Sequence, residues 1–247
     1  MSTGRPTIRR VGGLDGCRAG WVLATTILTS AGQAEVDRAQ VGQAEVRIVP
    51  TFADALSLVL DGTLAALGVD MPIGLPDAGL READRQARAR LGPRRSSVFA
   101  APVRAVLGAA DYPDALARSR AVDGRGLSKQ AFHLLPRIAE VDAAMTRDLQ
   151  DRVFECHPET CFARLAGRPL TTVKRDAEGR ADRTALLTPH LGDVTALWRD
   201  PPRGAKADDV LDALAITITA ERVLAGDVEH LGDGAIDRRG LRMEIVV

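Results

Sequence analysis

The pattern of apolar and polar positions predicts three strands near the start of the chain. Residues 11–15 and 21–28 are apolar runs separated by the glycine-bounded turn 16–20, and residues 44–50 alternate apolar with polar side chains. We expect these strands to form an antiparallel meander, with a polar loop over 30–41.

Apolar residues at helical spacing, with capping residues beside them, predict the helices. The expected helices are 52–61 after a Thr51 cap, 80–91, 128–148 after a Ser128 cap with a kink at Pro136, and 205–224 before the stop signal Gly226. Further strands are expected over 64–70, 152–156 and 241–247. This order predicts an α/β fold, in which helices flank a mixed sheet and residues 80–150 form a helical insertion.

Length and composition suit one folded domain. The chain has 247 residues, 45% of them apolar, so we expect a flexible tail over 1–10 and a single domain over 11–247. This apolar content excludes a mainly disordered protein. No apolar run approaches the ~18–20 residues that cross a bilayer, and none suits a secretion signal. We therefore expect a cytoplasmic protein without a membrane partner.

Cysteine count and net charge narrow the function. Cys17, Cys156 and Cys161 form no C-x-x-C pair, which disfavours a disulfide scaffold or a structural zinc site. The 33 basic and 33 acidic residues balance, which disfavours non-specific coating of nucleic acid. A local basic patch on an enzyme that binds nucleic acid stays compatible with this balance.

Acidic residues occur where the predicted strands end. Asp15 and Asp70 close two apolar strands, and Glu155 lies near the end of another. Ligands of open α/β sheets gather outside strand ends, so these three side chains are expected within a few ångströms of each other. Asp208, Asp209 and Asp212 open the last long helix, and the spacing does not choose between Asp208 and Asp209.

Clustered carboxylates raise one another's pKa unless a cation neutralises them, and oxygen ligands favour Mg²⁺ or Mn²⁺. Two such ions roughly 3.5–4 Å apart support phosphodiester hydrolysis. The competing interpretation is that each acid is a turn or cap residue. Asp212 fits that interpretation least, because it lies among apolar residues of the helix.

Seven arginines but only two acids occur between Arg81 and Arg104. They predict either a phosphate-binding surface or a solvated helix face. The candidate substrate-binding residues are Arg81, Arg94, Arg95, Ser96, Ser97, Gln130, Lys174 and Arg183, with surface charge as the alternative for the last two. His157 is a candidate acid or ligand, or a packed loop histidine, and Glu159 is either a site residue or a helix-start acid.

Several motifs occur in an order that resembles a family of predicted RNase-H-like nucleases, domain-of-unknown-function family 429. The resemblance runs from about Val11 to the C-terminus, and its main motifs are Gly13–Trp21, Val69–Gly74, Glu155–Glu159 and Asp208–Ala215. Asp209-x-x-Asp212-Ala-Leu-Ala is similar to the last-helix motif of RuvC-type resolvases.

The resemblance implies an RNase-H-like fold and a nuclease that binds DNA, RNA or a hybrid. It implies Asp15 as the first-strand acid and Asp209 or Asp212 as the last ligand. Those resolvases carry a glutamate where this chain has Asp70, so Glu155 becomes a candidate replacement ligand. The expected catalytic residues are Asp15, Asp70, Glu155, Asp209 and Asp212, all but Glu155 as ligands of two Mg²⁺ or Mn²⁺ ions. A homodimer is compatible with the sequence.

Three other functions stay open at this point. The turn after Asp15 also suits an actin-like or sugar-kinase-like phosphotransferase, although such kinases need a second domain. A non-catalytic binding module of the same fold and a hydrolase of small phosphoesters are the other two.

Overall fold

The computed structural model describes residues 9–28 and 43–247, which form two compact units. The first unit comprises residues 9–28, 43–70 and 172–228, and the second comprises 71–171 and 229–247. The chain therefore passes from the first unit to the second and back before it ends in the second. The predicted insertion over 80–150 lies within the second unit.

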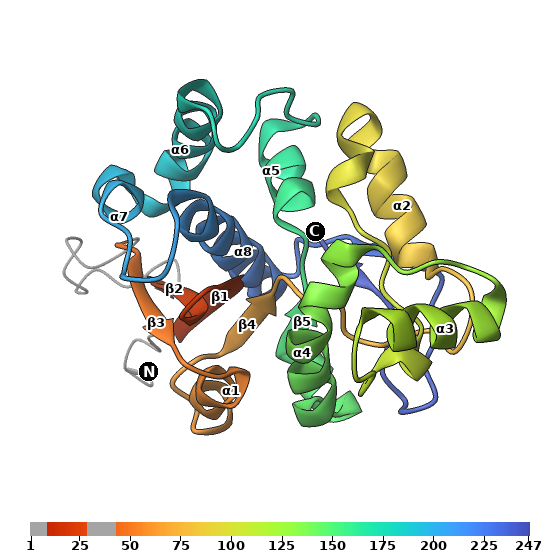
Figure 1. Cartoon of the computed structure of the whole chain (residues 1–247). Helices are drawn as coiled ribbons and strands as arrows, with labels where there is room; N and C mark the ends of the chain where they lie inside the picture. The colour runs from red at the N-terminus through yellow and green to blue at the C-terminus, as the bar shows by residue number, and fades with distance from the viewer. Residues whose placement is uncertain (1–8, 29–42) are drawn as a thin grey trace. The chain divides into compact units, whose positions relative to one another are not determined.

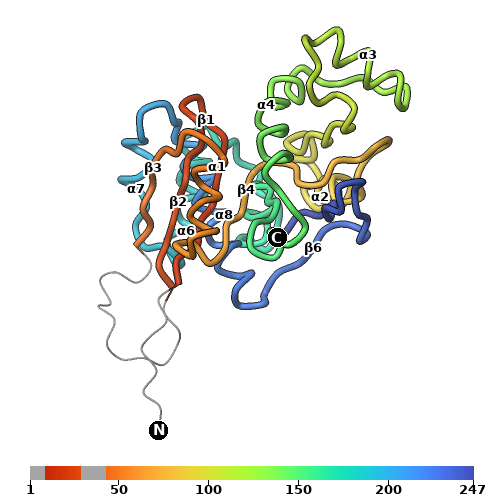
Figure 2. Tube along the Cα trace, turned by 90° about the horizontal axis from the view of Figure 1, so that it is seen from below, coloured from red at the N-terminus to blue at the C-terminus, as the bar shows by residue number. Residues whose placement is uncertain are grey.

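The first unit is built on a mixed sheet. Its strands lie in the order β3 (Glu45–Val49), β2 (Gly20–Leu28), β1 (Arg9–Cys17) and β4 (Ala66–Val69), and Figure 2 shows the first three side by side. β1 and β2 are antiparallel, as are β2 and β3, whereas β4 runs parallel to β1. The predicted antiparallel meander is confirmed. The parallel pair follows from helix α1 (Phe52–Leu60), which returns the chain to the end of the sheet where β1 begins.

Helices cover both faces of this sheet (Figure 1). Helix α1 packs against β2 and β3, and α8 (Ala207–Ala225) lies on the opposite face against β1, β2 and β4. Helices α6 (Ala177–Leu191) and α7 (Thr195–Arg199) pack on α8 in turn. Because α8 has neighbours on both sides, it is apolar almost all round, and its residues from Val210 to Ala220 are buried.

The backbones of α8 and β1 approach each other closely. A methyl group at Gly13 would lie 2.1 Å from the carbonyl oxygen of Ala213 and 2.5 Å from the amide nitrogen of Thr217. The Thr217 hydroxyl donates a hydrogen bond to the Ala24 carbonyl at 3.1 Å, and Ala24 is the partner of Gly13 in the sheet. Gly13 is thus the position that lets the helix backbone approach the strand.

The second unit is mainly helical. Its elements are α2 (Glu82–Leu91), η1 (Gly92–Ser97), η2 (Arg104–Val106), α3 (Tyr112–Asp123), α4 (Lys129–Ala144), η3 (Arg147–Asp151), β5 (Val153–Glu155), α5 (Pro158–Ala166), β6 (His230–Leu231) and β7 (Ile245–Val246). Helix α2 packs against α5 and against the antiparallel pair β6–β7. Alanines and branched side chains of these elements, including Ala83, Ala87 and Ile245, form its core.

Most boundary predictions hold to within a few residues. Thr51 caps α1, Ser128 caps α4, and Gly226 ends α8 with a left-handed φ of 71°. The predicted tail is wrong at its end, because Arg9 and Arg10 already pair with β2; residues 1–8 lie outside the described part. The predicted loop 30–41 also lies outside it.

Two longer predictions need correction. The helix expected over 128–148 ends at Ala144, and Pro136 lies within it. The strand expected over 241–247 is reduced to the two residues of β7.

In the described ranges 9–28 and 43–247, no helix is both long and apolar enough to cross a membrane.

The close approach at Gly13 leads to a test of the fold. We expect Gly13→Ala to lower the free energy of unfolding by about 3 kcal/mol or more, because the added methyl meets backbone atoms that cannot rotate away. Gly126→Ala is the control, since its new methyl would meet only the flexible Leu116 side chain at 3.7 Å. Urea denaturation followed by circular dichroism measures both. Equal midpoints for the two variants would contradict this account of the packing.

Candidate functional site

Two aspartates lie at the ends of the parallel strands of the first unit. Asp15 follows Gly13 by two positions in β1, so its side chain points to the face that α8 covers, and it is only 7% exposed. Asp70 follows β4 directly, and its backbone N–H donates to the Leu14 carbonyl at 2.9 Å. The parallel pairing of β1 with β4 therefore puts the two residues at the same end of the sheet.

The start of α8 supplies three more acidic residues. Asp212 is 2% exposed and Asp208 is 9% exposed, whereas Asp209 is half-buried. The Asp209 carboxylate accepts the backbone N–H of Lys206 at 2.9 Å, which is the hydrogen bond of a helix cap. Asp209 thus has a structural role that the sequence already allowed.

A lysine from the loop before α6 contacts these acids. The Lys174 Nζ lies 2.5 Å from an Asp212 carboxylate oxygen and 4.0 Å from Asp208. The exposed Arg175 approaches Asp208 at 3.6 Å. The Lys174 side chain is 33% exposed, and its ammonium is the ion-pair partner of the buried Asp212 carboxylate.

The electrostatics of the cluster disfavour the ionised form of Asp15. Burial raises the pKa of its carboxyl well above the ordinary value, and the neighbouring Asp70 and Asp212 raise it further. Burial lowers the pKa of Lys174, but Asp212, Asp15 and Asp70 outweigh this and raise it overall. The pKa of the Asp209 carboxyl is also raised, chiefly by burial. One ammonium therefore faces several carboxylates.

The donor chemistry of this cluster fits a hard divalent cation. Carboxylate oxygens are the ligands that Mg²⁺ and Mn²⁺ prefer, and a cation beside Asp15 would oppose the rise in pKa that burial, Asp70 and Asp212 cause. In residues 9–28 and 43–247, no three His, Cys, Asp or Glu side chains are already arranged as a ligand set. Lys174 provides the counter-charge at Asp212 instead.

Glu155 lies in the second unit, where a buried ion-pair network engages it. Its two oxygens accept hydrogen bonds from the guanidinium of Arg81, each at 2.7 Å, and one also accepts the N–H of Ile73. Arg81 pairs as well with Asp84 at 2.6 Å. All three charged side chains are at most 6% exposed, which favours a structural role for Glu155 and Arg81.

The other predicted residues are found in different surroundings. Arg183 is fully buried and donates to the Gly179 carbonyl at 3.1 Å, so the surface-charge alternative is wrong for it. Arg94 lies 3.6 Å from Glu159, and the Ser97 hydroxyl donates to the Arg94 carbonyl at 2.8 Å. In the second unit, His157 Nε2 lies 3.3 Å from the Ser97 carbonyl oxygen. Arg95, Ser96 and Gln130 line a cavity of the same unit.

The chain was compared with protein families, curated proteins and solved structures. Residues 13–235 match the model of a family described as "Protein of unknown function (DUF429)". Neither a curated protein nor a solved structure matches the chain.

The repulsion at Asp15 leads to a prediction about stability. Since the folded pKa of Asp15 is raised, the folded state loses stability as pH rises through that pKa. We expect Asp15→Asn to raise the free energy of unfolding at pH 7, without divalent ions, by roughly 1–3 kcal/mol. Thermal unfolding in chelator measures this, with the exposed Asp148→Asn as the control. A lower melting temperature for Asp15→Asn would show that this carboxylate stabilises the fold.

The network around Glu155 predicts a change of the opposite sign. Glu155→Gln leaves the buried Arg81 with only part of its neutralisation, so we expect a loss of about 3 kcal/mol or more. Glu82→Gln, which removes a partner of the exposed Arg85, is the control and should cost less than about 1 kcal/mol. Chemical denaturation of both variants tests this. Unchanged stability of Glu155→Gln would reopen a catalytic role for Glu155.

Proposed function

This chain belongs to the DUF429 family, whose description assigns no activity, and we propose that it is a divalent-metal-dependent hydrolase of phosphodiester bonds in nucleic acid. One observation supports this most: the buried Asp15 carboxyl, with its raised pKa, lies beside Asp70 and Asp212 at the end of a parallel strand pair. Such a cluster costs folding energy and is typical of a site that binds a cation. The mixed sheet is consistent with the RNase-H-like fold that the motifs imply.

Asp15, Asp70 and Asp212 are the residues that would hold Mg²⁺ or Mn²⁺, and we propose two ions. Bound there, such ions neutralise phosphate charge and activate water as the nucleophile. Asp209 would act through the helix, because its capping hydrogen bond fixes the first turn of α8 and with it the position of Asp212.

Lys174 would change partners in this proposal. A cation at Asp212 repels the ammonium that now lies 2.5 Å from that carboxylate. Lys174 would then leave Asp212 and, with the neighbouring Arg175, contact a backbone phosphate of the substrate. The two side chains are basic and follow each other in one loop, which supports a nucleic-acid strand as the substrate.

A second candidate is a nucleic-acid-binding module without turnover. The ion pair between Lys174 and Asp212 favours it, because a lysine that already neutralises Asp212 reduces the need for a metal. The two candidates differ in one result, which is cleavage in the presence of bound metal.

The test is a cleavage assay with Mn²⁺ or Mg²⁺ on labelled single strands, duplexes, RNA–DNA hybrids and four-way junctions. We expect metal-dependent cleavage that Asp15→Asn and Asp70→Asn each reduce at least about 100-fold, because each removes a direct ligand. Asp148→Asn, an exposed aspartate outside the cluster, should cleave like the wild type.

Calorimetry with Mn²⁺ accompanies the assay. Bound Mn²⁺ with no cleavage of any substrate would overturn the hydrolase proposal and favour the binding module. Cleavage that survives in both cluster variants would show that the activity does not come from this site.

A further inference from the structure

A cavity of about 490 Å³ lies wholly within the second unit. Its walls come from α2, η1, the segment 98–103, the end of α3 and the start of α4. None of the acids of the carboxylate cluster belongs to it, so it is a separate feature of the molecule. A volume of this size accommodates a small organic ligand.

The charge of the wall is positive. Arg88, Arg95 and Arg125 line the cavity, with Asp123 as the single acid among its lining residues. Asp123 is already engaged, because its two oxygens accept the backbone N–H groups of Gly79 at 2.9 Å and Arg125 at 3.0 Å. Three guanidinium groups around one opening repel each other, and an anion between them would offset that repulsion.

The arginines differ in how they are held. The Arg88 Nε donates to the Val98 carbonyl at 2.9 Å, which fixes its guanidinium and leaves the terminal nitrogens for a ligand. The exposed Arg95 side chain makes no hydrogen bond or ion pair with any residue of 9–28 or 43–247. Arg125 approaches Asp123 only at 4.0 Å. The wall thus offers guanidinium donors of the kind that bind phosphoryl oxygens.

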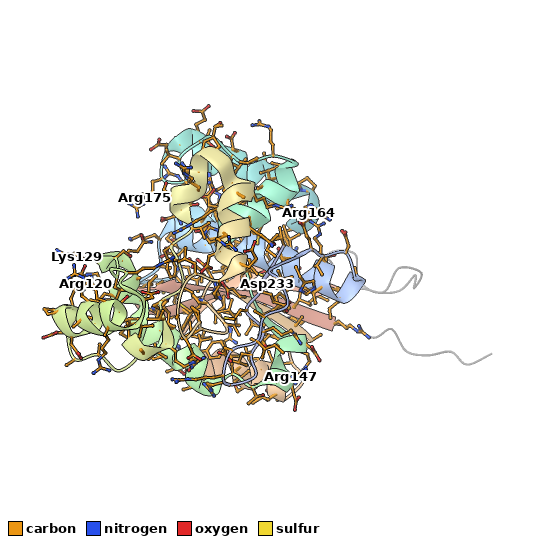
Figure 3. All side chains as sticks on the ribbon, turned by 90° about the vertical axis from the view of Figure 1, so that its right-hand side faces the viewer. Arg120, Lys129, Arg147, Arg164, Arg175 and Asp233 are labelled. Atoms are coloured by element: carbon orange, nitrogen blue, oxygen red, sulfur yellow. The ribbon has the colours of Figure 1, made fainter. Side chains whose placement is uncertain are left out.

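Further donors and an apolar surface complete the wall. Ser96, Ser119 and Gln130 also line the cavity, as does Ser128, which caps the 16-residue helix α4. The apolar part includes Phe99 and Leu127. Figure 3 shows two more exposed basic side chains, Arg120 near the end of α3 and Lys129 at the start of α4. The combination suits a ligand with one strongly anionic group and one apolar or planar group.

We propose that this cavity binds the phosphoryl group of a ligand the size of a nucleoside monophosphate. Arg88, Arg95 and Arg125 contact the phosphoryl oxygens, and the apolar wall beside Phe99 takes the organic part. The phosphoryl group has two possible sources, a free nucleotide or the end of a nucleic-acid strand. The proposal does not depend on metal binding or cleavage at the carboxylate cluster.

The test is calorimetry on the full chain in chelator, with inorganic phosphate, 5′-AMP, adenosine and a five-nucleotide single strand as probes. We expect 5′-AMP to bind and adenosine to bind far more weakly. Arg95→Glu/Arg125→Glu should weaken binding of 5′-AMP and phosphate at least about tenfold, because two charge-assisted contacts are replaced by repulsion. Both arginines are exposed, so the double variant should fold, and its melting temperature checks this.

The matched control is Arg147→Glu/Arg168→Glu, which changes the net charge equally at two exposed arginines of the same unit that do not line the cavity. It should bind like the wild type. If the single strand displaces 5′-AMP, the source is nucleic acid; if it does not, the source is a free nucleotide, and both results support the phosphoryl site. Equal weakening in both double variants, or no binding of phosphate and 5′-AMP at millimolar concentration, would overturn it. Asp15→Asn should bind 5′-AMP normally, which separates this result from the cleavage assay.

Discussion

The contact between the backbone of α8 and β1 at Gly13 is the constraint on which the first unit depends. A residue with any side chain would push the helix away, since a methyl would lie 2.1 Å from a helix carbonyl. The approach lets Thr217 bond to the neighbouring strand β2 at 3.1 Å. It also fixes the position of α8 along the axis of β1. Asp15 lies two positions beyond Gly13, and Asp212 lies one position before Ala213, so the same contact brings the two acids into electrostatic contact.

The two units treat buried charge in different ways. In the second unit, Glu155 and Asp84 share the guanidinium of Arg81, and Asp142 and Asp237 share that of Arg104, so each carboxylate has an arginine partner. In the first unit, Lys174 faces Asp15, Asp70 and Asp212, and the pKa of Asp15 is raised, first by burial and then by the neighbouring Asp70 and Asp212. Electrostatic cost that a fold leaves uncompensated tends to occur at functional sites. Burial also raises the pKa of Glu155, to about 7, but Arg81 opposes that rise, whereas the carboxylates beside Asp15 add to its rise. This difference supports the first unit as the place of the proposed activity.

Local sequence signals predicted much of the secondary structure. Thr51, Ser128 and Gly226 act where capping rules place them, because a cap depends only on neighbouring backbone groups. The helix predicted over 128–148 is too long, because Met145 has an extended ψ of 140° and the polar residues 146–148 lie beyond the helix end. No separate helix was predicted for α3, α5, α6 or α7. The amphipathic pattern of α6 is weak because two of the four residues that it buries are Gly179 and Arg183.

The sequence alone determined which acids end strands, that Asp212 lies in an apolar helix, and that the chain forms a mixed α/β fold. These follow from period and position along the chain. The tertiary structure decided the partners: Lys174 for Asp212, Arg81 for Glu155, and a buried interior for Arg183. Sequence spacing cannot give these pairs, because 38 residues separate Lys174 from Asp212 and 74 separate Arg81 from Glu155. Whether a charged side chain binds a ligand or neutralises a neighbour depends on which distant residue the fold brings within a few ångströms.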